Sequence, residues 1–216
     1  MHLYQFIAIT HCWMIGLGIC DYYIKTHWKQ SRYYLINMII NLAINVMCIQ
    51  DVYMALVNPI EFMTQSNTCI IPLAAITAIN IYHFIYFHYN FIDYIHNIFI
   101  ILIVIPGCFY NKFYGITNAI LFFAMGLTQT IHNFMMILTT IEKLKPITEK
   151  RITMILNTWI RVPGILYTCT LAYIQGYLDN DITFTRLLLI TYFITCTLYQ
   201  GYTKTLNYGK RLGKKR

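Results

Sequence analysis

The sequence predicts an all-α protein: a polytopic integral membrane helix bundle. Hydrophobic residues make up 58% of the chain and charged residues 11%, whereas a soluble domain has about 25% charged residues. Apolar stretches of about 17–25 residues, the length that crosses a bilayer core, recur along the whole chain. Lys and Arg residues gather in alternate connecting segments, which is the pattern of a multi-pass protein.

About seven of these stretches can be placed as transmembrane helices. The predicted spans are Leu3–Ile24, Tyr33–Val57, Cys69–His88, Tyr94–Tyr110, Gly115–Thr140, Ile152–Gln175 and Ile182–Tyr202. Since only Tyr89–Asp93 separates the third span from the fourth, these two form a tight helical hairpin in this prediction. The first span is followed by basic residues and not preceded by them, which indicates a retained anchor.

The basic residues predict the orientation. With seven spans, thirteen of them fall on one side of the membrane, and Lys112 and Arg186 fall on the other. The thirteen are Lys25, Lys29, Arg32, Lys143, Lys145, Lys150, Arg151, Lys204, Lys210, Arg211, Lys214, Lys215 and Arg216. Because cytoplasmic loops carry the excess of positive charge, we expect a lumenal N-terminus and a cytosolic C-terminus. The net charge of +8 is mainly this topology signal, so we expect no nucleic-acid partner.

Neither the cysteines nor the histidines are grouped as in a metal site. The seven cysteines stand singly, without a C-x-x-C pair, and none of the seven histidines is adjacent to another. A zinc site or a disulfide framework needs paired spacings, and a membrane di-iron site needs clustered histidines. We therefore expect no metal and no cofactor.

Polar residues inside the predicted spans indicate a cavity. Such residues are costly in a bilayer, so each needs a partner, a cavity or an interface. Five spans place them in the half nearer the cytosol, which favours a shared polar cavity open to the cytosol over separate interhelical hydrogen bonds. The predicted lipid-cavity residues are His88, Gln129, His132, Asn133, Asn157 and Arg161, with Asn37, Asn41 and Asn45 as a further polar stripe.

Arg161 is the most informative of these residues. It lies about 12 Å from the cytosolic end of its predicted span. Its side chain either extends to the headgroups, binds an anion such as phosphate or carboxylate, or pairs with Asp93. The residues leave all three interpretations open.

Asp93 and His96 form a second candidate site. At a spacing of three residues on a helix, the carboxylate can fix the imidazole tautomer and leave the other ring nitrogen as a base. The alternative is two polar residues at a helix start, with Asp93 as its cap.

Three stretches resemble a known family in their spacing and order: FIDYIHN (Phe91–Asn97), AMGLTQTIHNFMMIL (Ala124–Leu138) and ITEKRITMILNTWIRVPG (Ile147–Gly164). They are similar to the TLC domain, named for the TRAM, LAG1 and CLN8 proteins. The resemblance runs from Tyr33 to the C-terminus and implies a bundle with a six-helix core. It divides the chain into a first transmembrane anchor and cytosolic loop (residues 1–32), a TLC-like transmembrane domain (33–203) and a basic cytosolic tail (204–216).

The resemblance also implies a lipid-related function. Its best-known members are ceramide synthases of the endoplasmic reticulum, which transfer an acyl group from acyl-CoA to a sphingoid amine; other members handle lipids without catalysis. Asp93 and His96 match the catalytic Asp and the first His of that family, while Asn97 stands where the second His is expected and cannot exchange a proton near neutral pH.

We therefore expect a protein of an internal membrane, such as the endoplasmic reticulum, with membrane lipids as partners and a role in lipid binding, sensing or homeostasis. The alternative is an acyl-CoA-dependent N-acyltransferase with Asp93, His96 and Asn97 as catalytic residues and acyl-CoA as a further partner. A further alternative is a small seven-span solute carrier, against which the dissimilar halves of the chain argue.

Overall fold

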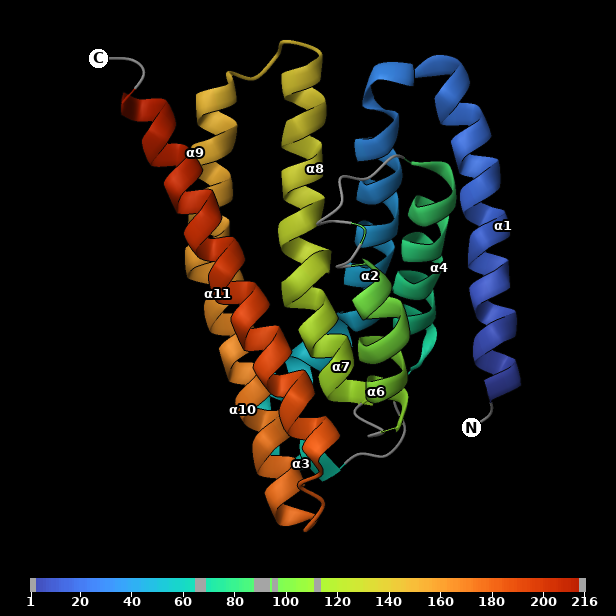
Figure 1. The fold of residues 1–216 in the computed structure, drawn as a ribbon, viewed down its shortest axis with the longest axis vertical. Coiled ribbons are helices and arrows are strands. Elements are labelled where there is room, and N and C mark those ends of the chain that lie inside the picture. Colours follow the sequence, from blue (N-terminus) through green and yellow to red (C-terminus); the bar gives the residue numbers. More distant parts are fainter. Residues whose placement is uncertain (1–2, 65–68, 88–93, 95–96, 111–113, 214–216) are drawn as a thin grey trace.

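The structure is a computed structural model that describes residues 3–64, 69–87, 94, 97–110 and 114–213. All regular elements in these residues are helical, which confirms the all-α prediction. Figure 1 shows a bundle in which the long helices run close to the long axis of the molecule.

The α-helices are α1 (Leu3–His27), α2 (Arg32–Val57), α3 (Pro59–Thr64), α4 (Ile71–Tyr86), α6 (Ile105–Tyr110), α7 (Tyr114–Leu121), α8 (Leu127–Thr140), α9 (Pro146–Leu156), α10 (Val162–Leu178) and α11 (Phe184–Gly213). A 3-10 turn, η1 (Lys29–Ser31), precedes α2. Three π-helical segments lie within longer helices of the described chain: η2 (Ile100–Val104), η3 (Phe122–Gly126) and η4 (Asn157–Arg161). The segment η2 leads into α6, η3 joins α7 to α8, and η4 joins α9 to α10.

Three helices among the described residues are long and apolar enough to cross a membrane: Leu3–His27, Lys29–Val57 and Gly115–Thr140. They coincide with the first, second and fifth predicted spans. The third and fourth predicted spans correspond to the shorter apolar helices Ile71–Tyr86 and Asn97–Phe109. The predicted turn between these two spans, Tyr89–Asp93, lies outside the described residues.

The sixth predicted span is part of a longer helix, because α9, η4 and α10 are continuous from residue 146 to residue 178. The prediction placed its start at Ile152, after the charged residues, whereas the structure begins it at Pro146. Proline is favoured in the first turn of a helix, where its missing N–H costs nothing. Charged residues of this first turn, Glu149 among them, are therefore helical and not part of a loop.

The basic residues gather at one end of the bundle. In Figure 1 the α1–α2 turn, the α8–α9 turn and the C-terminal end of α11 lie at the same, upper end, which we call the basic end. Its described basic residues are Lys25, Lys29, Arg32, Lys143, Lys145, Lys150, Arg151, Lys204, Lys210 and Arg211. The start of α1, α3 and the α10–α11 turn lie toward the opposite end, which we call the far end.

Close packing in the middle of the bundle depends on small residues. In α4 the residues Ala74, Ala75 and Ala78 are fully buried. A Cβ atom on Gly164 would lie 2.3 Å from the Phe123 ring, so this glycine lets α10 lie directly against η3. Small residues of this kind allow helix backbones to approach closely.

At the basic end, a buried ion pair joins the first helices. Asp21 of α1 is 6% exposed, and its carboxylate accepts hydrogen bonds of 2.5 Å from Nε and from Nη2 of Arg32. The hydroxyl of Tyr82 on α4 donates a third, at 2.6 Å. This cluster links α1, α2 and α4 to one another.

Candidate functional site

A cavity of about 470 Å³ lies inside the bundle. It is lined by α2, α4, the helix that contains η2 and α6, the helix that runs from α7 through η3 to α8, and α11, together with Arg161 of η4. Polar and apolar side chains both line the cavity, and they lie in different parts of it.

The lining changes from apolar to polar toward the basic end. Figure 1 shows that α4, the helix from α7 to α8, and α11 all run from the far end to the basic end. On α4 the lining residues are first Leu73 and Ile76, then Asn80 and His83. Along α7–α8 they are first Leu121, Ala124 and Met125, then Gln129, His132 and Asn133.

The same order holds on α11, where Phe193 is followed by Gln200, Thr203 and Lys204. At the basic end α2 adds Tyr33, Tyr34, Asn37 and Asn41. Thr117 and Arg161 are polar exceptions among the deeper residues. The cavity is thus amphipathic along its length.

Each of the three π-helical segments contributes to the lining, through Ile100 and Val104 of η2, Ala124 of η3 and Arg161 of η4. A π-helical turn inserts a residue into an α-helix and leaves part of the backbone ladder displaced, and such turns are frequent at functional sites. Their gathering around one cavity marks this part of the bundle as the candidate site.

Arg161 is a buried cation without a partner in the described part of the chain. Its side chain is 6% exposed, and its Nε atom is buried without a hydrogen bond. The ion pairs found among the described residues involve other groups. A buried charge normally has a partner, because its removal from water is costly. The charge of Arg161 is therefore not balanced by a direct contact within the described residues.

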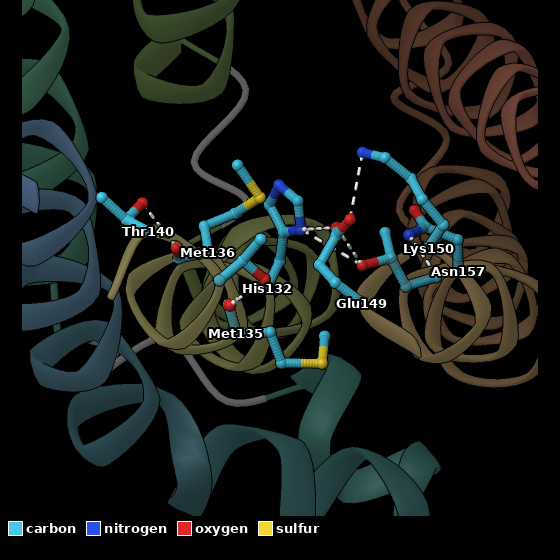
Figure 2. Close-up of polar contacts among 9 residues, drawn as sticks. His132, Met135, Met136, Thr140, Glu149, Lys150 and Asn157 are labelled. Carbon is cyan, nitrogen blue, oxygen red and sulfur yellow. Dashed lines mark hydrogen bonds and ion pairs between the residues drawn. The ribbon is translucent and has the colours of Figure 1, made fainter. Parts of the chain in front are cut away.

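Where the polar lining meets α9, His132 and Glu149 form a carboxylate–imidazole pair. Figure 2 shows His132 on α8 facing Glu149 on α9. The His132 Nδ1 atom lies 3.2 Å from Glu149 Oε1 and 3.2 Å from Thr153 Oγ1. The Thr153 hydroxyl donates to Glu149 Oε1 at 3.0 Å, and Lys150 Nζ lies 3.1 Å from Oε2.

This arrangement fixes the protonation of the pair. Glu149 is 1% exposed; burial raises the pKa of its carboxyl, but hydrogen bonds from His132, Lys150 and Thr153 and the Lys150 charge together lower it to about 2. The ionised carboxylate accepts the proton on Nδ1 of His132, so Nε2 is the nitrogen that can accept a proton. That nitrogen lies on the opposite edge of the ring from Glu149 (Figure 2), and His132 lines the cavity.

The structure brings most of the predicted cavity residues within the described chain together. Asn97, Gln129, His132, Asn133 and Arg161 line the same cavity, as do Asn37 and Asn41 of the predicted stripe. Asn45 bonds to Thr130 at 3.2 Å instead.

Asn157 does not belong to the lining. Its side-chain amide donates to the Thr153 carbonyl oxygen at 2.8 Å, because a buried asparagine can bond to the preceding turn of its own helix. The assignment of Asn157 to the lipid site therefore stays a prediction. His88, Asp93 and His96 lie outside the described residues.

In the predicted fifth span, which ends at Thr140, His132 lies about 12 Å from the cytosolic end, the same depth as Arg161; the structure places the two residues at different depths. His132 contacts Thr153, and Arg161 follows Thr153 by two turns of the same helix, which is about 12 Å farther from the basic end. The cause is the earlier start of the helix at Pro146, which places Glu149 and Thr153 beside His132 and leaves Arg161 farther along. Arg161 thus lies deep in the cavity and His132 near the basic end.

The sequence prediction missed two charged residues of this region, Glu149 and Lys204. Glu149 and Thr153 share a helix face once the helix begins at Pro146, so the P-x-x-E start was the available signal. Lys204 was assigned to a tail, yet α11 continues to Gly213 and Lys204 lines the cavity. In the described residues, no group of three or more His, Cys, Asp or Glu side chains is arranged to hold a metal ion.

Comparisons of the chain with protein-family models, with curated proteins and with solved structures find no match.

Proposed function

We propose that the chain is a multi-pass membrane protein that binds a membrane lipid in its cavity and acts in lipid binding, sensing or homeostasis. The observation that carries this proposal is the change of the lining from apolar to polar toward the basic end. A lipid changes in the same way from its tail to its headgroup, so both parts would find matching surroundings. The volume of about 470 Å³ is that of a small-molecule site.

The outer surface supports a membrane environment. Large apolar side chains are exposed along α2, where Val46 is 69%, Ile49 61% and Tyr53 61% exposed. Soluble monomers rarely expose wide apolar patches, whereas a bilayer covers them. The three described helices that are long and apolar enough to cross a membrane, and the basic residues at one end, support the proposal of a bundle with about seven spans and its basic end in the cytosol.

The resemblance to the TLC domain is part of the same proposal. The second and third resembling stretches form α8 with the end of η3, and α9 with η4, and these elements carry His132, Glu149 and Arg161. A TLC-like protein would reside in the endoplasmic reticulum or another internal membrane. The first stretch lies mostly outside the described residues.

The test is identification of lipid that remains bound to the purified protein. The full chain is extracted in mild detergent and its bound lipids are identified by native mass spectrometry. Ala124→Trp would fill the cavity, since Ala124 lines it, and Ala8→Trp is the matched control on the exposed face of α1. Lipid lost from the first variant and kept by the second supports the proposal. A wild-type protein that carries no lipid and takes up none from a lipid panel contradicts it.

The His132–Glu149 pair favours a second candidate, an acyl-CoA-dependent N-acyltransferase. In this version Nε2 of His132 accepts the proton of an amine as its nitrogen attacks the acyl thioester carbonyl. The C–S bond then breaks, and the departing thiolate takes the proton. This role gives His132 the function that the sequence prediction gave to His96.

The second candidate is tested by turnover in nanodiscs with acyl-CoAs and long-chain amines. If His132 is the base, His132→Ala abolishes product formation, while Asn97→His, which restores the pair of the family, leaves activity equal or higher. If His96 is the base, His96→Ala abolishes it instead. Absence of product from the wild-type protein with the whole panel contradicts the enzymatic candidate and leaves the lipid-binding one intact.

A further inference from the structure

Two cations line the cavity without a hydrogen bond or ion pair to any described residue: Arg161 of η4 and Lys204 of α11. Arg161 is 94% buried, as its 6% exposure implies, and Lys204 is partly buried. Two positive charges in one cavity, neither in an ion pair with a described carboxylate, favour the binding of an anion.

The two charges can reach one ligand. The segment η4, which carries Arg161, packs against α11, and Arg161 and Cys196 of α11 line the same cavity. Lys204 follows Cys196 by two turns, about 12 Å toward the basic end. Both side chains are long, so their charged groups can approach each other across much of this distance. Burial lowers the pKa of the Lys204 ammonium, as do the Lys150 and Arg161 charges, whereas Glu149 raises it; the four groups are therefore electrostatic neighbours.

No described carboxylate forms an ion pair with Arg161 or Lys204. Glu149 contacts Lys150 and His132, Asp21 contacts Arg32, and Asp181 contacts Arg186. Asp51 accepts a hydrogen bond from Asn118 on another wall of the bundle. Among the described residues that line it, the cavity thus keeps an excess of positive charge.

We propose that Arg161 and Lys204 bind the phosphate monoester headgroup of the lipid, a refinement that rests on the proposed lipid-binding function. A phosphate monoester carries about −1.5 to −2 charges near pH 7, which matches two cations. The guanidinium offers a planar fork of N–H donors that fits phosphate oxygens bidentately, and its buried Nε would then have an acceptor. The lipid tail would extend from Arg161 along Leu121, Ile76 and Leu73 toward the far end.

The test measures the affinity of the full chain in detergent for phosphatidic acid and for phosphatidylcholine with the same acyl chains. We expect wild-type protein to bind phosphatidic acid more tightly. Arg161→Gln should weaken that binding about tenfold to a hundredfold, the loss of one or two charge-assisted hydrogen bonds, and Lys204→Gln about tenfold. Lys210→Gln removes the same charge from an exposed position of the same helix and should leave the affinity unchanged.

Inorganic phosphate distinguishes a lipid headgroup from a free ion. We expect it to compete with phosphatidic acid only at much higher concentration, because it lacks the tail. Binding of phosphate as tight as that of the lipid would overturn the lipid assignment. Equal affinity for both lipids, with no change of affinity in Lys204→Gln, would overturn the headgroup site. This conclusion would hold even if Arg161→Gln did not fold. Lipid binding by the cavity would still stand. Binding of neither lipid would overturn both proposals.

Discussion

The Nδ1 atom of His132 lies 3.2 Å from the Oε1 atom of Glu149, and this contact joins α8 to α9 near the basic end. The carboxylate is buried with Lys150 and Thr153 as its other partners. It therefore holds two helices together and also sets which nitrogen of His132 faces away from it. Stability and chemistry at this end of the cavity depend on the same charge.

Replacement of this carboxylate should weaken the protein and change its response to acid. We expect Glu149→Gln to lower the free energy of unfolding by about 1–3 kcal/mol at pH 7, because hydrogen bonds to a buried charge are lost. The folded pKa of about 2 lies below the ordinary value of 4.5. The stability that the carboxylate supplies is therefore complete above about pH 4.5 and is lost as the pH falls toward 2.

Thermal unfolding in detergent between pH 7 and pH 3 measures both effects. The decrease with acid should be smaller in Glu149→Gln than in wild type. Glu142→Gln makes the same change at an exposed position of the neighbouring turn and should alter stability by less than about 0.5 kcal/mol. A Glu149→Gln protein as stable as wild type at pH 7 would show that the pair adds nothing to the fold.

Removal of the buried charge of Arg161 should stabilise the lipid-free protein. A cation without a partner opposes folding, and replacement of buried charges by apolar groups is often stabilising by about 1–4 kcal/mol. We expect Arg161→Met to raise the melting temperature of delipidated protein, with exposed Arg151→Met as an unchanged control. A fall in melting temperature would indicate that Arg161 has a protein partner.

The ion pair of Asp21 and Arg32 should behave as one unit. Asp21→Asn leaves Arg32 without its counterion; because the Arg32 side chain is 22% exposed, the cost should be below the value of about 3–5 kcal/mol for a fully buried pair. Because both members act through the same contact, the double variant with Arg32→Gln should be no less stable than Asp21→Asn alone. Chemical denaturation of the three variants gives the coupling energy. Strictly additive losses would mean that the two side chains stabilise α1 and α2 independently.

The orientation of the bundle can be tested with inserted tags. With the basic end in the cytosol, tags after residue 216 and in the turn at Lys143 should be accessible from the cytosol. A tag at Asn180, between α10 and α11, should be protected there and accessible from the lumen. Tags at Lys143 and Asn180 that report the same side would contradict a membrane crossing between them.

The sequence predicted those features that depend only on the order of apolar and polar residues within a single helix. The length of the apolar stretches was sufficient to locate α1, α2 and the helix Gly115–Thr140. Polar spacing on one helix identified Gln129, His132 and Asn133 as residues of one lining. Both features are local, because a helix repeats every 3.6 residues whatever it packs against.

Features that depend on pairs of helices could not be predicted in this way. The contact of His132 with Glu149 depends on the register between α8 and α9, and an error of six residues in the start of α9 moved Arg161 away from the level of His132. The π-helical segments η2, η3 and η4 have no sequence signature, since packing around the cavity decides where a helix widens. Lys204 lines the cavity because α11 extends beyond its apolar part.

Photocrosslinking tests the central claim, lipid binding in the cavity, most directly. A phosphatidic acid analogue with a photoreactive group in its acyl chain is irradiated with the protein in nanodiscs, and the labelled residues are mapped by mass spectrometry. We predict labels at the apolar lining residues Leu73, Ile76 or Leu121 that unlabelled phosphatidic acid removes by competition. Labels confined to the outer face of α2, at Val46, Ile49 or Tyr53, and insensitive to competition, would contradict it.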